Sequence, residues 1–343
     1  MERHEVIRDT GSGIGSGIVV CGVHREAEGD VPRCFGNEID ETASGPKRIP
    51  HMRIGITGAT GFIGRHLSSA AREQGHEVIE YSRRPGAVLT QPKNAPHALP
   101  ETKLDALVHL SGESLMGLWT QEKRERIWKS RVDFTGALVT HLDTWKMENL
   151  PKVLVCASGA GFYGNSGTER VDESAPRGES FLADVCASWE KAAMRAESLG
   201  MRVILLRTGM VLGSDGGAFP LLRRVFGLGL GGRLGSGEQW MSWIHIDDAV
   251  QIVLNAIETE SVSGPVNLCA PEAATNAEFT TKLAAVLKRP AFFHAPAFAL
   301  KLLLRGMAEE MLLGGQRVIP RVATEMGYGF AHPTLDSALK ALV

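Results

Sequence analysis

The chain has 343 residues, of which 43% are hydrophobic and 22% are charged, which is the composition of a packed globular protein. Its 37 Lys and Arg residues nearly balance its 39 Asp and Glu residues, so no overall basic field favours nucleic acid or an anionic membrane as a partner. No apolar stretch approaches the roughly 20 residues that span a bilayer. We therefore expect no transmembrane segment and a small molecule as the partner.

The five cysteines form neither a CxxC pair nor a Cys/His ligand spacing. This pattern argues against a bound metal and against a disulfide framework. It is typical of a protein from a reducing compartment, and we expect the cytoplasm.

Residues 1–51 are rich in glycine, charge and turn-forming residues and lack a sustained apolar period, so we expect them to be disordered. Glu2, Glu5 and Asp9 argue against a signal or transit peptide, which avoids acidic residues. Because Met52 directly precedes the first clear strand, a wrongly assigned upstream start is a second hypothesis. The glycine tract at 11–17 lacks the preceding strand of a phosphate-binding loop, and we do not expect it to function as one.

From Met52 onward, predicted strands alternate with predicted helices. Apolar runs predict strands at 53–57, 77–81, 106–110, 153–156 and 202–206, with helical patterns between them. This alternation predicts an α/β fold of the Rossmann type, a doubly wound parallel sheet with a smaller C-terminal region. We expect a dinucleotide-binding domain over 52–260, in which 213–242 contribute to the cleft, and a C-terminal domain over 261–343.

The sequence GATGFIG at 58–64 follows the first predicted strand and opens a helix. In this GxxGxxG spacing, Gly58 makes the tight turn, Gly61 lets the backbone approach a pyrophosphate, and Gly64 lets the helix pack on the strand. Glycines alone also fit a plain strand-to-helix turn, but here strand, loop, helix and second strand follow within about 30 residues, as dinucleotide binding requires. The predicted cofactor-binding residues of this loop are Gly58, Thr60, Gly61, Phe62, Ile63 and Gly64.

The second predicted strand ends in Ser82, Arg83 and Arg84. A protein that binds NAD typically places an acidic residue there for the ribose hydroxyls, whereas two guanidinium groups suit the 2′-phosphate of NADP(H). Glu80 lies close enough to leave NAD(H) as an alternative, and a solvated basic turn is the other interpretation. The sequence favours NADP(H).

Several further blocks resemble one family in their residues and in their order. They are HLSGE at 109–113, WTQEK at 119–123, SRV at 130–132, SGAGFYG at 158–164, GSG at 235–237, WIHID at 243–247 and GPVN at 264–267. From Met52 to the C-terminus, the chain resembles the extended short-chain dehydrogenase/reductases, also called the NAD-dependent epimerase/dehydratase superfamily. It is most similar to the atypical branch labelled epimerase family protein, or sugar-nucleotide-epimerase-like, whose members carry an uncharacterised C-terminal domain. Many relatives form a homodimer through two helices, and the resemblance allows one here.

The catalytic pattern of that family is altered. Active members carry Tyr-x-x-x-Lys on a helix, in which the lysine lowers the pKa of the tyrosine for proton transfer. The corresponding helix here places Cys186 at the tyrosine position and Glu190 at the lysine position. A carboxylate there raises the pKa of Cys186, so we favour core packing and keep Cys186 only as a weak catalytic candidate.

Two further positions leave alternatives open. The resemblance requires a hydroxyl four residues before Tyr163, where this chain has Gly159; Ser158 lies one residue earlier. Ser158 either faces the nicotinamide as a weak catalytic candidate or caps the following turn. Arg131 replaces the family asparagine, and it either reaches a phosphate or an anionic substrate or is an exposed helix charge.

The residues Leu110, Ser111, Gly112 and Glu113 follow the third predicted strand, at the edge where open α/β sheets bind ligands. We expect them to contact the cofactor, with Glu113 near the ribose or the substrate. His109 is expected to be a core histidine. The block at 244–248 is expected to be scaffold, and the pattern predicts Asp247 or Asp248 as a helix N-cap.

Residues 213–237 are rich in glycine and carry Arg223, Arg224 and Arg233, and Trp240 and Trp243 follow. In the family this stretch lines the substrate cleft, where arginines hold a phosphate and a tryptophan covers a sugar-like face. A flexible loop with an exposed basic helix is the alternative, and we favour the cleft.

Two classes of function follow. The first is an NADP-dependent oxidoreductase or epimerase that acts on a nucleotide-sugar-like or other small carbonyl compound with a nonstandard proton donor, such as a water held by Ser158. The second is a noncatalytic NADP(H)-binding protein that senses redox state or binds a partner. The altered Tyr-x-x-x-Lys pattern favours the second, and the intact cofactor loop favours the first.

Overall fold

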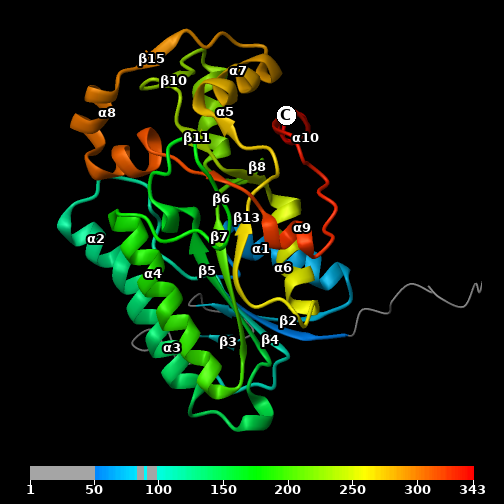
Figure 1. Cartoon of the computed structure of the whole chain (residues 1–343). Coiled ribbons are helices and arrows are strands. Elements are labelled where there is room, and N and C mark those ends of the chain that lie inside the picture. Colours follow the sequence, from blue (N-terminus) through cyan, green and yellow to red (C-terminus); the bar gives the residue numbers. More distant parts are fainter. Residues whose placement is uncertain (1–50, 83–88, 91–98) are drawn as a thin grey trace, which may run out of the picture. The chain divides into compact units, whose positions relative to one another are not determined.

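The computed structural model describes residues 51–82, 89–90 and 99–343. Its main element is a seven-stranded sheet in which all neighbouring strands are parallel (Figure 1). In chain order the strands are β1 (Arg53–Thr57), β2 (Glu77–Ser82), β3 (Leu89–Thr90), β4 (Ala106–His109), β5 (Val153–Gly159), β7 (Arg202–Thr208) and β13 (Gly264–Leu268). The predicted α/β fold of the Rossmann type is confirmed.

The order of the strands places the ligand-binding edge of the sheet. It runs β13-β7-β5-β4-β1-β2-β3, so the direction of chain progression reverses between β1 and β4. Open parallel sheets bind ligands beyond the carboxyl ends of the strands at such a reversal. The segments that follow β1, β4 and β5 therefore meet at one edge.

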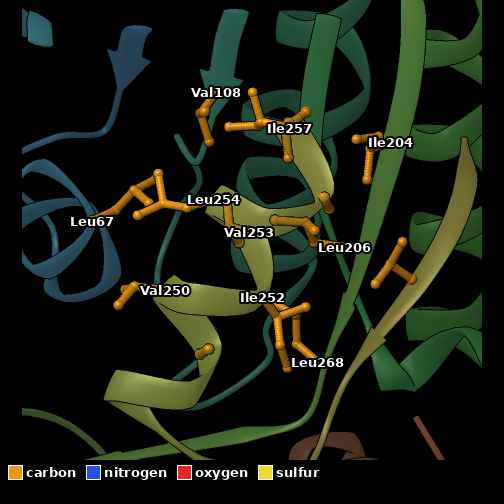
Figure 2. Packing of buried hydrophobic residues seen from close by; sticks show 14 of the residues in the cluster. Leu67, Val108, Ile204, Leu206, Val250, Ile252, Val253, Leu254, Ile257 and Leu268 are labelled. Carbon is orange, nitrogen blue, oxygen red and sulfur yellow. The ribbon is translucent and has the colours of Figure 1, made fainter. Parts of the chain in front are cut away.

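The strands are continuous apolar runs because helices cover both faces of the sheet. On one face lie α1 (Phe62–Glu73), α6 (Ile246–Glu258) and α9 (Arg321–Glu325). Figure 2 shows Leu67 of α1 and Val253 and Leu254 of α6 among Val108 and Leu206 of the strands. Burying an aliphatic side chain of this size contributes about 1.5–3 kcal/mol.

The opposite face is covered by α3 (Phe134–Leu142) and α4 (Phe181–Met194). Leu138 and Leu142 lie four residues apart on α3, and Trp189 and Ala193 lie four apart on α4, so each helix presents one apolar stripe to the strands. The helix α2 (Gln121–Trp128) runs through a wide π-helical turn, Lys129–Asp133, directly into α3. Such turns occur frequently at functional sites.

Apart from α6, β13 and α9, most of the chain beyond β7 builds a smaller region on top of the sheet (Figure 1). Its elements are β8 (Met210–Gly213), β9 (Gly216–Gly217), α5 (Phe219–Gly227), β10 (Gly232–Leu234), β11 (Trp240–Met241), β12 (Trp243–His245), β14 (Ala274–Thr275), α7 (Asn276–Leu287), β15 (Phe293–Ala295), α8 (Ala297–Leu304), β16 (Arg317–Val318) and α10 (Leu335–Ala341). Phe219, Trp243, Phe279 and Leu339 share one core here. Residues before and after position 261 thus pack together, and the predicted boundary at that position stays a prediction.

The predictions for residues 1–50 lie outside the described residues, as do Arg83 and Arg84. Within the described part of the chain, no helix is long and apolar enough to cross a membrane. Cys156, Cys186 and Cys269 are free and buried.

Candidate cofactor and substrate site

The loop between β1 and α1 has the backbone geometry that its glycines predict. Gly58 has φ +74°, and the N–H of Gly61 donates to its carbonyl at 2.9 Å. A Cβ on residue 64 would lie 2.3 Å from the oxygen of Gly58, so only glycine lets α1 pack this closely. The tight turn and the close packing are confirmed, and the contact with a cofactor stays a prediction.

The N-terminus of α1 is suited to an anion. Gly61 is its N-cap, and no side chain caps the first turn, which also carries no acidic residue. The first N–H groups of a helix lack intrahelical acceptors and carry a partial positive charge. A Cβ on Gly58 would lie 3.0 Å from the backbone of Leu110 and Ser111, so this N-terminus and the segment after β4 lie together at the predicted edge.

A hollow of about 340 Å³ lies between α1 and β2, lined by Ala59, Thr60, Arg65, Ser68, Ser69, Arg72 and Glu80. Within it, Nη2 of Arg72 donates to Oε1 of Glu80 at 2.7 Å. The carboxylate of Glu80, the group for which NAD(H) remained an alternative cofactor, is therefore held toward α1. Ser82 is the last residue of β2, and the predicted contacts of Arg83 and Arg84 with a 2′-phosphate stay predictions.

Glu113 is held by cations. Its Oε1 accepts from Nζ of Lys123 at 2.7 Å and lies 3.6 Å from Nε of Arg126. Hydrogen bonding from Lys123 lowers the pKa of Glu113. Its backbone N–H donates to Oγ of Ser130 at 3.0 Å, which ties the segment after β4 to the π-helical turn. The expected contact of Glu113 with a ribose or a substrate stays a prediction.

Arg131 lies in the π-helical turn, beside Gly112. A Cβ on residue 112 would approach its guanidinium carbon to 3.3 Å, so glycine leaves the room that this group occupies. The same carbon lies 5.3 Å from the ring centroid of Trp189 on α4. Arg131 is partly buried rather than exposed, which argues against the interpretation as an exposed helix charge.

Ser158, Glu190 and Arg207 form a buried network at the ends of β5 and β7. Ser158 Oγ donates to Oε1 of Glu190 at 2.7 Å. Nε and Nη2 of Arg207 donate to the two oxygens of Glu190 at 3.0 and 2.9 Å. Nη1 of Arg207 donates to the hydroxyl of Tyr163, which donates to Asn267. Neither predicted role of Ser158 included its bond to Glu190, because these two residues lie 32 positions apart and no local pattern links them.

Cys186 and Tyr163 both hold their protons tightly. Burial and then the charge of Glu190 raise the pKa of Cys186 to about 11, which confirms the predicted effect of that carboxylate. Burial likewise raises the pKa of Tyr163 to about 12. A catalytic acid works best with a pKa near the working pH, and neither group meets that condition.

His109 is a core histidine, as predicted. Its two ring nitrogens lie 2.7 Å from Oγ1 of Thr57 and 3.0 Å from Oγ1 of Thr135, and Thr135 also accepts from Trp189. Burial lowers the pKa of His109 to about 4, so the ring is neutral at pH 7 and fixes β1, β4 and α3 together.

The predicted N-cap of α6 is wrong. His245 caps the helix, because its Nδ1 accepts the backbone N–H of Asp247 at 3.2 Å. Asp248 instead accepts the hydroxyl of Tyr328 and the N–H groups of Ala331 and His332 at 2.7–2.9 Å, which supports the predicted scaffold role. His245, Asp247 and His332 place one potential ligand atom each within 4.8 Å of one another, a group that the sequence spacing did not indicate.

The two tryptophans expected near the substrate have other partners. Trp243 is fully buried in the core of the smaller region, so its predicted contact with a substrate is wrong. The ring of Trp240 is covered by the guanidinium of Arg317, 4.1 Å from its centroid. Arg223, Arg224 and Arg233 are exposed, and their place in a substrate cleft stays a prediction.

A family model for the NAD dependent epimerase/dehydratase family matches residues 54–269. The chain belongs to this family. A second model, a domain of unknown function called DUF1731, matches residues 295–342. Both matches confirm the resemblance found in the sequence, including the uncharacterised C-terminal segment.

The family includes relatives that align over most of the chain. The epimerase family protein SDR39U1 homolog, chloroplastic, of Arabidopsis thaliana is 35% identical over 329 residues, which cover 91% of this chain and 94% of the relative. The crystal structure of human epimerase family protein SDR39U1 (isoform 2) with NADPH has a TM-score of 0.78 at 37% identity and covers 85% of this chain and 99% of that one. A nucleoside-diphosphate sugar epimerase from Corynebacterium glutamicum has a TM-score of 0.68 at 32% identity and covers 84% of this chain and 57% of that one.

Proposed function

We propose that the protein binds NADP(H) at the loop between β1 and α1 and acts as an oxidoreductase on a nucleotide-sugar-like or other small carbonyl compound. The observation that carries this proposal is the loop itself. Gly58 turns the chain, Gly64 packs α1 against the turn, and the uncapped N-terminus of α1 lies at the ligand-binding edge of the sheet. This arrangement suits a pyrophosphate.

Three observations support NADP(H) over NAD(H). Arg72 holds the carboxylate of Glu80, which is the acidic side chain nearer the carboxyl end of β2, where ribose hydroxyls would bind. Arg83 and Arg84 follow β2 in sequence and bring two positive charges suited to a 2′-phosphate. The human relative, 37% identical, was crystallised with NADPH.

When bound, NADPH supplies a hydride to the carbonyl carbon of a substrate. The proton for the carbonyl oxygen must then come from a group other than a tyrosine with a lowered pKa. Because the hydroxyl proton of Ser158 points to Glu190, its oxygen accepts hydrogen bonds from elsewhere. In this proposal Ser158 orients a water, which delivers the proton to the carbonyl oxygen, and the hydroxide that remains takes a proton from the solvent.

A noncatalytic NADP(H)-binding protein is the second candidate. The ion pair of Glu190 with Arg207 occupies the position where active relatives carry the lysine, and this observation favours it. Such a protein keeps cofactor binding and transfers no hydride.

The two candidates are distinguished by deuterium transfer. The protein is incubated with NADPH that is deuterated at C4 on either face and with a panel of aldehydes, ketones and keto sugars. The deuterium content of the products is then measured by mass spectrometry. The oxidoreductase proposal predicts a deuterated product, and it predicts that Ser158→Ala keeps NADPH affinity but lowers turnover by about 10²-fold. Saturable NADPH binding without transfer to any compound would support the second candidate.

A further inference from the structure

Arg131 is a partly buried cation whose side-chain hydrogen bonds are few and long. Its Nη1 lies 3.5 Å from the carbonyl of Ile127 and 3.4 Å from Oγ of Ser130, and these are the hydrogen bonds of its side chain to described residues. A guanidinium carries five N–H donors in a rigid fork. Most of these donors therefore remain for a ligand.

No carboxylate among the described residues pairs with Arg131. Glu113 is close enough to act on its charge, but Lys123 and Arg126 already hold that carboxylate. Arg207, in the same region, has a bidentate partner in Glu190. A charge that is withdrawn from water without a partner is costly, so this difference between two arginines that both contact α4 indicates that Arg131 is completed by an anion.

The surroundings of Arg131 place that anion. Gly112 follows β4, and Trp189 and Cys186 belong to α4, which packs beside β5. The adenosine half of a dinucleotide lies over β1 and β2 in such a fold, and the nicotinamide half lies over the strands on the other side of the reversal. Arg131 thus lies on the half of the site where a substrate would meet the nicotinamide.

We propose that Arg131 binds an oxyanion of the substrate, a carboxylate or a phosphate, and thereby orients the substrate in the cofactor site. This inference rests on the proposed function and adds the chemical class of the substrate. The fork of a guanidinium matches both oxyanions with two parallel hydrogen bonds. The N-terminus of α1 serves the pyrophosphate of the cofactor, which leaves Arg131 for a second anion.

The test measures two affinities separately in the full chain. NADPH binding is followed by its fluorescence, and oxalate and inorganic phosphate are then titrated calorimetrically into the NADPH complex. Arg131→Met removes the charge. Lys129→Met serves as the matched control. It removes a charge two residues away from Arg131, on a side chain that is 66% exposed.

The proposal predicts that Arg131→Met keeps NADPH affinity within about twofold and weakens oxyanion binding by about 30-fold or more, because a desolvated charge pair is lost. Lys129→Met behaves as the original protein does. Stronger binding of oxalate than of phosphate identifies a carboxylate substrate, and the reverse order identifies a phosphorylated one. If Arg131→Met does not fold, Arg131→Lys replaces it; this variant keeps the charge without the fork, and we expect about tenfold weaker oxyanion binding.

Three outcomes overturn the inference. In the first, neither probe binds the NADPH complex. In the second, both probes bind Arg131→Met as tightly as the original protein. In the third, Arg131→Met loses NADPH affinity itself, which assigns the guanidinium to the cofactor and leaves the proposed function intact. Failure of the original protein to bind NADPH at all would instead refute the proposed function.

Discussion

Glu190 and Arg207 form a bidentate ion pair inside the protein, with donor–acceptor distances of 3.0 and 2.9 Å and side chains that are 9% and 6% exposed. The pair links α4 to β7, and it explains why this chain carries a carboxylate where active relatives carry a lysine. Its first consequence concerns stability. Removing one partner leaves the other charge buried without compensation.

We expect Glu190→Leu to lower the free energy of unfolding by about 3–5 kcal/mol, whereas Glu190→Leu combined with Arg207→Leu costs less than the sum of the two single changes. Urea unfolding followed by circular dichroism measures all three variants. Additive losses would mean that the two side chains contribute independently and that the pair has no special role.

Cys186 is expected to be unreactive in the folded protein. Because its pKa is raised to about 11, only about a thousandth of it is thiolate at pH 8, and the thiolate is the form that reacts. Iodoacetamide at pH 8 should leave Cys186 unmodified in the native protein and label it in urea, as read by peptide mass spectrometry. Rapid native labelling would contradict the assigned environment and revive its role as a nucleophile.

His109 should make stability depend on pH. Its pKa is about 4 in the folded protein, below the value of about 6.5 in an unfolded chain, so the unfolded state binds the proton more readily. The stabilising contribution is complete above about pH 6.5 and is lost as the pH falls toward 4. Between pH 7 and pH 5 we expect this contribution to the free energy of unfolding to fall by about 2 kcal/mol. His109→Asn should therefore show a shallower decline in urea-unfolding free energy over that range, and equal slopes would refute the prediction.

Asp248 should hold the C-terminal segment in place. Its carboxylate accepts three hydrogen bonds from Tyr328, Ala331 and His332, whereas the side chain of its neighbour Asp247 is 63% exposed. Asp248→Asn should lower the free energy of unfolding by about 2–3 kcal/mol and speed proteolysis near residue 330, while Asp247→Asn should change both little. Similar effects of the two changes would argue against this anchoring role.

The main features of the fold follow from local sequence patterns. Short apolar runs and the spacing of Gly58, Gly61 and Gly64 suffice to predict a parallel sheet and the loop that opens α1, because these features depend on residues adjacent in the chain. The altered catalytic positions could also be recognised, since Cys186 and Glu190 lie on one predictable helix.

Long-range pairings could not be predicted from the same patterns. Nothing local links Arg207 to Glu190, or Asp248 to the segment around Tyr328, which lies 80 residues later. Trp243 was misplaced for a related reason: an aromatic residue near a glycine-rich stretch fits a binding cleft and a core equally well until its neighbours in space are known. Such pairings arise only when the smaller region packs on the sheet.

The proposed binding of NADP(H) at the loop between β1 and α1 is tested by a fluorescence titration of the protein with NADPH and with NADH, alongside Gly64→Ala and Gly227→Ala. A Cβ on residue 64 would meet the oxygen of Gly58 at 2.3 Å, whereas one on residue 227 has no neighbour within 4 Å. We predict at least about tenfold tighter binding of NADPH than of NADH, lost in Gly64→Ala and kept in Gly227→Ala. Binding of neither nucleotide, or undiminished binding by Gly64→Ala, would contradict the claim.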